Sequence, residues 1–229
     1  MLDPNGGCTT PNVLFAIEAE RQAIEQEIER IIVGDFRRSS AAVGAIDIFV
    51  DPGVNGPRAM TDWLSRNSFG QTINKKKMMD GYDAGDYSVP DIVTSRGMVA
   101  KSEFYEIKPN SDSGKWEGTH KITRFLRLNH DFHLLFFAGD QYDPITSSLL
   151  RSVHTIGATE YELQLHWFRD VPGLILYEVC YKVRKKVEVK QEVPIAEAAL
   201  IALLALLLIL LLKGARGNPG SIGAPPITA

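Results

Sequence analysis

Two short β-type runs, residues 88–94 and 103–109, are the feature that most constrains how this chain folds. Both are rich in β-branched and aromatic residues and have Pro or Gly at their borders, which is typical of strands. Residues i and i+2 of a strand point to the same face. We therefore expect Glu106 and Lys108 to project together, while the residues beside them turn to the packed side. If Asp91 stands at the start of the neighbouring strand, its carboxylate converges on the same place.

Two carboxylates and an amine at one place suit the hydrolysis of a phosphodiester. Mg²⁺ takes oxygen ligands and usually keeps several waters, so one or two carboxylates and a substrate phosphate can hold it. Such a cation lowers the pKa of a bound water and neutralises charge in the transition state. A lysine beside it can orient or deprotonate the attacking water, or stabilise developing charge. The pattern predicts Asp91 and Glu106 as metal ligands and Asp91, Glu106 and Lys108 as catalytic residues, with Mg²⁺ or alternatively Mn²⁺ as the cofactor.

Pro90-Asp91 followed by Glu106-Ile107-Lys108 resembles the PD-(D/E)XK signature of the restriction-endonuclease-like nucleases. The run at residues 105–111 is similar to members among bacterial toxin and repair nucleases, and the resemblance covers residues 12–140. It implies a mixed α/β sheet flanked by helices and a metal-dependent endonuclease that hydrolyses nucleic-acid phosphodiester bonds, in DNA rather than RNA. A toxin, effector or defence role, with an inhibitor or immunity protein as a partner, is suggested by the resemblance alone.

The resemblance also directs attention to the first helix, because related nucleases often add an acidic residue from it to the metal site. The sequence predicts this helix over residues 12–33, with Gly34 as its end. At 100° per residue, Glu20 lies closest to the apolar stripe and Glu27 next, so Glu20 is the third predicted metal ligand. The apolar stripe consists of Leu14, Ile17, Ile24, Ile28 and Ile31.

The remaining elements follow from local patterns. The helix after the motif carries Lys121 where nuclease relatives often have a glutamine, so the role of that position is in doubt. A strand at residues 45–50 ends at the strong turn signal Asp51-Pro52-Gly53. We further expect helices at residues 59–65 and 115–129, a polar loop at 81–87, and strands at 132–137, 160–168 and 174–183.

Composition limits the partners and the compartment. The 229 residues suit one domain with a tail, and the net charge of −3 does not by itself indicate nucleic-acid binding. A nuclease would need local basic patches, for which Lys75-Lys76-Lys77 and residues 182–186 are the candidates, although charge runs are often only solvated faces. Cys8 and Cys180 are far apart in sequence and lack metal-ligand spacing, so we expect no disulfide framework and a reducing compartment.

A second strong signal is an apolar run of 18 residues that begins at Ile195 and ends at Leu212, interrupted only by Glu197. As a helix it would be about 27 Å long, close to the hydrocarbon thickness of a bilayer. Basic residues precede it, which by the positive-inside tendency places the folded domain in the cytoplasm. We therefore expect a membrane-associated protein anchored by residues 195–212, with a buried interface helix as the alternative.

The sequence thus predicts three segments: a nuclease-like domain at residues 1–190, a hydrophobic transmembrane helix at 191–213, and a disordered Gly/Pro-rich tail at 214–229. The expected function is a Mg²⁺-dependent endonuclease. Two alternatives stay open: a membrane-tethered binding or scaffold protein with an inactive nuclease-like core, and a membrane-active effector whose C-terminal segment carries the activity.

Overall fold

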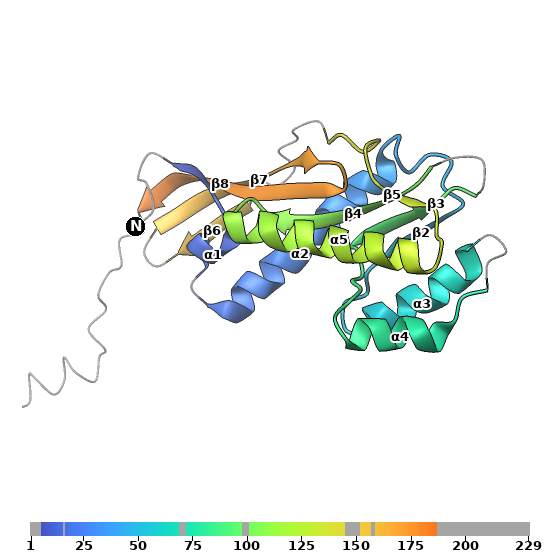
Figure 1. Cartoon of the computed structure of the whole chain (residues 1–229). Helices are drawn as coiled ribbons and strands as arrows, with labels where there is room; N and C mark the ends of the chain where they lie inside the picture. Colours follow the sequence, from blue (N-terminus) through green and yellow to red (C-terminus); the bar gives the residue numbers. More distant parts are fainter. Residues whose placement is uncertain are drawn as a thin grey trace, which may run out of the picture. The chain divides into compact units, whose positions relative to one another are not determined.

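A computed structural model describes residues 6–15, 17–68, 72–97, 101–144, 152–156 and 159–186. Their strands form one mixed sheet with the order β2-β3-β4-β8-β7-β6, in which β1 also pairs with β8 and β5 with β4 (Figure 1). β4 runs parallel to β5 and β8 and antiparallel to β3. The strands are β1 (Gly7–Thr9), β2 (Asp47–Val50), β3 (Ile92–Ser95), β4 (Ser102–Pro109), β5 (Phe136–Ala138), β6 (Ser152–Ile156), β7 (Thr159–Val171) and β8 (Leu174–Lys186).

Helices cover both faces of this sheet, as the sequence predicted for an α/β fold. On one face α2 packs with Ile107, Tyr177 and Trp167 in a first apolar cluster. On the other face α3, α4 and α5 pack with Phe49 and Phe104 in a second cluster. The helices are α1 (Pro11–Leu14), α2 (Glu18–Arg38), α3 (Gly56–Asn67), α4 (Lys75–Asp83) and α5 (Asp112–Asp131).

The predicted first helix at residues 12–33 is wrong in its bounds, because the chain forms two helices there. Ile17 precedes α2 and is 59% exposed, so it belongs to no buried stripe. The stripe of α2 is Ile28, Ile32 and Phe36, all buried. Burial of Phe36 rewards continuation of the helix through Gly34, and this outweighs the weak intrinsic preference of glycine for ending it.

β4 follows the predicted run at residues 103–109 closely, whereas β3 begins four residues later than the predicted run at residues 88–94. β3 starts one residue after Asp91, and β4 contains both Glu106 and Lys108. Ile107 is buried among the residues that contact α2, as expected for the packed side of the strand. β3 and β4 pair at Ile92–Tyr105 and Val93–Phe104, which leaves the end of β4 running past the start of β3. The candidate residues lie at this place.

The two cysteines form a disulfide, contrary to the expectation from the sequence. Cys8 in β1 and Cys180 in β8 are opposite each other in the strand pair and are joined as a disulfide. The expectation of a reducing compartment rested on unpaired cysteines and loses that support.

The predicted transmembrane helix at residues 191–213, its apolar run at 195–212 and the tail at 214–229 lie outside the described residues. Within the described ranges, no helix is both long and apolar enough to cross a membrane.

Candidate active site

Asp91 is held at the open edge of β4 by a backbone contact. Its Oδ2 accepts a hydrogen bond of 2.6 Å from the N–H of Ile107. The carboxylate thus takes the place of a strand carbonyl beyond the end of the β3–β4 ladder. Ser88 Oγ donates to the carbonyl of Lys121 at 2.6 Å, which ties the segment before Asp91 to α5. A carboxylate has about four acceptor positions, so one backbone contact leaves Asp91 able to bind a cation.

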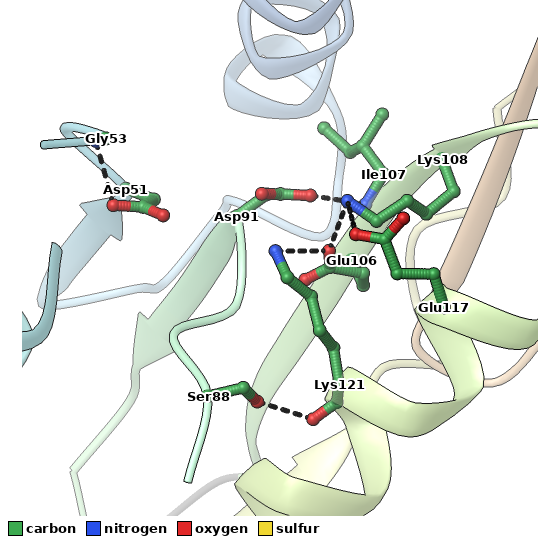
Figure 2. Close-up of polar contacts among 9 residues, drawn as sticks. All are labelled: Asp51, Gly53, Ser88, Asp91, Glu106, Ile107, Lys108, Glu117 and Lys121. Atoms are coloured by element: carbon green, nitrogen blue, oxygen red, sulfur yellow. Dashed lines mark hydrogen bonds and ion pairs between the residues drawn. The ribbon is translucent and has the colours of Figure 1, made fainter. Parts of the chain in front are cut away.

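Glu106 is the most buried carboxylate of the site, with 1% of its surface exposed. Its Oε1 lies 2.8 Å from the Nζ atoms of both Lys108 and Lys121 (Figure 2). Its Oε2 is fully buried and has no hydrogen-bond partner among the described residues. A buried oxygen of this kind costs stability unless something satisfies it. Glu106 therefore has one neutralised oxygen and one that is available to a ligand.

The pKa of Glu106 reflects this crowding. Burial raises it, the charge of Asp91 raises it further, and Lys108 and Lys121 offset part of the rise, so the pKa reaches about 7. Burial opposes the charged form of Lys108, yet Glu106 and Asp91 raise its pKa above the ordinary value. The same opposing effects raise the pKa of Lys121. Both lysines therefore stay charged at neutral pH, so Lys108 is suited to donate hydrogen bonds and not to accept a proton.

The structure brings Asp91, Glu106 and Lys108 together, as the sequence predicted, but it does not bring Glu20 to them. Glu20 is exposed. The glutamates of α2 that interact with Asp91 or Lys108 are Glu29 and Glu25. With about 100° per residue, Glu20 lies about 120° from the buried stripe of α2, whereas Glu29 lies about 60° from it.

Glu29 shares the electrostatic environment of the site. Burial raises its pKa most, Asp91 adds to the rise, and Lys108 and Lys121 oppose it, so the pKa is about 7. Glu29, Asp91 and Ile107 line a hollow of about 360 Å³, together with Arg37. A second hollow of about 360 Å³ lies against Glu29, Lys108 and the start of α5. Glu29 thus lines both hollows.

Asp51 completes the acidic group from the turn after β2. Its N–H donates to the carbonyl of Asp91 at 3.0 Å, and its Oδ1 accepts from the N–H of Gly53 at 2.9 Å. Burial raises its pKa, the Gly53 contact offsets part of this, and Asp91 raises it again. The sequence identified Asp51 only as a turn residue, which it also is. Its place beside Asp91 depends on the pairing of β2 with β3 and has no local signal.

Glycines let α5 approach the strands that carry the site. A Cβ at Gly118 would lie 2.5 Å from Leu174 Cδ1 and 3.2 Å from Lys108 Cγ. The helix therefore lies directly over the stem of Lys108. One turn after Gly118, Lys121 reaches Glu106. Just before Gly118, Glu117 Oε1 lies 3.6 Å from Lys108 Nζ. Lys121, which the sequence left undecided, is part of the site.

The residues of the predicted basic patches are not among those that line the two hollows. In α4, Lys75 pairs with Asp62 at 2.7 Å and Lys76 with Asp80 at 3.0 Å. Those lysines are largely neutralised by neighbouring carboxylates. Lys182 and Arg184 in β8 are exposed. Near the acidic group itself, Arg37 of α2 lines the hollow that holds Asp91.

Comparison of the chain with protein-family models, with curated proteins and with solved structures gave no match. The assignment of a function therefore depends on the residues of the site.

Proposed function

We propose that the chain is a metal-dependent nuclease of the restriction-endonuclease-like kind, and that its site hydrolyses phosphodiester bonds of nucleic acid, in DNA rather than RNA. The observation that carries the proposal is the buried carboxylate of Glu106, with one oxygen on two ammonium groups and the other without a partner among the described residues. Asp91 immediately precedes the adjacent strand β3 and is bonded to the backbone of β4. This is an oxygen donor set of the type that Mg²⁺ and Mn²⁺ prefer.

The acidic residues fit a divalent cation by charge as well. Asp91 raises the pKa of Glu106, of Glu29 and of Asp51, so Asp91 repels each of these carboxylates. A cation between Asp91 and Glu106 would relieve that repulsion and satisfy the orphaned oxygen. When bound, Mg²⁺ would polarise the phosphoryl group, lower the pKa of a coordinated water and neutralise developing charge.

The charge states of the other side chains at the site suggest their roles in the reaction. Lys108 is held charged, so it stabilises the negative charge that develops on the phosphoryl oxygens and does not act as the base. Glu29, with a pKa of about 7, is suited to take the proton of the attacking water at neutral pH. It faces the hollow beside Asp91, where such a water has room. Lys121 opposes the rise in the pKa of Glu106 and holds its carboxylate in place.

The cationic groups beside the site supply the affinity for a polyanion that the net charge of −3 does not. Arg37 in α2 and Arg21 in the same helix line the two hollows, next to the acidic group. Arginines of this kind bind phosphates and position the strand without reading its sequence. The repulsion of DNA by the acidic group would fall once a cation is bound.

Cleavage of supercoiled plasmid by the full-length chain in detergent tests the proposal. We expect nicked and linear products with Mg²⁺ or Mn²⁺ and none with EDTA. Glu106→Gln should lose cleavage, because it removes the charged ligand. Glu117→Gln is the matched control, because Glu117 is an exposed carboxylate that also pairs with Lys108. The cleavage rate of this variant should stay within about threefold of the wild-type rate. Product formation in EDTA, or equal rates for the two variants, would exclude this mechanism.

A further inference from the structure

Four side chains with metal-ligating atoms lie together on one face of β1, β8 and β7. Cys8 is opposite Cys180 in the β1–β8 pair, and His166 is opposite Glu178 in the β7–β8 pair. Glu178 and Cys180 are two residues apart on one strand and so point to the same face. One donor atom from each residue lies within 4.8 Å of those of the other three. The register of three neighbouring strands therefore assembles the cluster from positions 8, 166, 178 and 180.

Two thiols, an imidazole and a carboxylate are the ligands of tetrahedral zinc sites. His166 Nδ1 already lies 3.2 Å from Cys180 Sγ. Asn110 donates a hydrogen bond of 3.0 Å to Glu178 Oε2, which orients that carboxylate as outer contacts do at metal sites. With zinc–ligand bonds of about 2.0–2.3 Å, tetrahedral donors stand about 3.3–3.8 Å apart. The donor atoms of the cluster lie within 4.8 Å of one another, so no separation exceeds this range by more than about 1 Å.

The disulfide and the metal exclude each other, because the zinc ligand is the thiolate. Reduction by a dithiol or a phosphine breaks the Cys8–Cys180 bond. The two sulfurs take up two electrons and two protons and become thiols, while the dithiol becomes a disulfide or the phosphine a phosphine oxide with oxygen from water. Binding of Zn²⁺ then displaces the two thiol protons to solvent.

We propose that Cys8, His166, Glu178 and Cys180 form a structural zinc site in the reduced protein. The four protein ligands fill a tetrahedral set and leave no open position, which marks a structural site as opposed to a catalytic one. Zinc there replaces the disulfide as the link between β8 and the three-residue strand β1. The N-terminal strand is thereby held in both redox states, and only a reduced, zinc-free protein releases it.

Thiolate ligation gives a signature that the acidic site cannot produce. The full-length chain is reduced with a phosphine, which adds no competing thiols, and titrated with Co²⁺. We expect the near-ultraviolet thiolate-to-cobalt absorption to saturate at one ion per chain and to disappear on addition of Zn²⁺. The disulfide form should show no such band. Asp91→Asn should leave the band unchanged, since the ligands around Asp91 are oxygens.

Variants distinguish a built site from two cysteines that bind by themselves. His166→Ala and Glu178→Gln should each weaken Co²⁺ and Zn²⁺ binding more than about tenfold, and Asn110→Ala by about tenfold. None of these substitutions removes Cys8 or Cys180, so each variant can be purified oxidised and then reduced. Zn²⁺ should also raise the Tm of the reduced wild type and not that of the oxidised form. The proposal is overturned if the reduced wild type gives no thiolate band, or if both ligand variants bind as tightly as wild type.

Discussion

We expect the ionised carboxylate of Glu29 to lower the stability of the folded protein. Its pKa is raised from an ordinary 4.5 to about 7, first by burial and then by Asp91. In the unfolded chain the pKa returns to the ordinary value. Between about pH 4.5 and 7 the folded protein therefore binds more protons at Glu29 than the unfolded chain does. Without a cation, this contribution to stability is complete below about pH 4.5 and is lost as the pH rises through about 7.

The magnitude follows from the size of the pKa change. At 1.36 kcal/mol for each pKa unit, the rise from 4.5 to about 7 corresponds to about 3.4 kcal/mol. The side chain is only half-buried, and solvent screening reduces this to about 2 kcal/mol. Glu29→Gln keeps the shape and removes the charge. In EDTA at about pH 8 the variant should be about 2 kcal/mol more stable than wild type, with a Tm about 4–8 °C higher.

Urea unfolding at about pH 4 and about pH 8, in EDTA, measures this difference. The two proteins should agree at the lower pH and separate at the higher one. Glu27→Gln is the matched control on the same helix, because Arg30 lowers the pKa of Glu27 by a direct hydrogen bond. That variant should gain no stability at about pH 8. An identical pH profile for Glu29→Gln and wild type, or equal stabilisation of Glu27→Gln, would contradict the raised pKa of Glu29. With Mg²⁺, Glu29→Gln should lose cleavage by about 10²–10⁴-fold and still bind the cation.

Four further predictions follow from the site. Lys108→Ala should lower kcat by about 10²–10³-fold and leave KM for plasmid within about threefold, because its charge acts in the transition state; a change confined to KM would contradict this. Arg37→Ala should reduce, by about one, the slope of the logarithm of the DNA-binding constant against the logarithm of the salt concentration. Fluorescence anisotropy measures this slope, and an unchanged slope would mean that DNA does not contact Arg37. Binding of Mg²⁺ at about pH 7 should release protons from Glu106 and Glu29, because the pKa of each is raised to about 7. Calorimetry would show this release as a binding enthalpy that depends on the buffer. No release would show that these two carboxylates are neither ligands nor neighbours of the cation. Gly118→Val should destabilise the fold by about 1–3 kcal/mol in urea, because its Cβ meets Leu174 Cδ1 at 2.5 Å, and a neutral result would mean that α5 does not approach β4 so closely.

The part of the site that lies on β3 and β4 could be predicted because its signals are local. The alternation around Glu106 fixes which side chains share a face, and Pro90-Asp91 marks the start of the neighbouring strand. The sequence favoured Glu20 because Ile17 looks like part of the stripe until the start of the helix is known, whereas the structure leaves Glu20 exposed. With Phe36 recognised as a buried residue of the same helix, the sequence would have favoured Glu25 and Glu29 over Glu20.

Contacts between residues far apart in the sequence left no comparable local pattern. Cys8 and Cys180 are 172 residues apart and meet only because β1 adds to the edge of β8. Lys121 reaches Glu106 because Gly118 allows α5 to lie close to β4, a packing property that helix periodicity does not contain. Such contacts depend on the assembled sheet, so local propensity could not supply them.

The proposed function depends on one divalent cation held between Asp91 and Glu106. Anomalous diffraction from crystals of the protein soaked in Mn²⁺ tests it most directly. We expect a peak about 2.0–2.3 Å from carboxylate oxygens of both residues, on the Oε2 side of Glu106, and loss of the peak in Asp91→Asn. A map of the wild type with no peak beside these carboxylates would contradict the proposal.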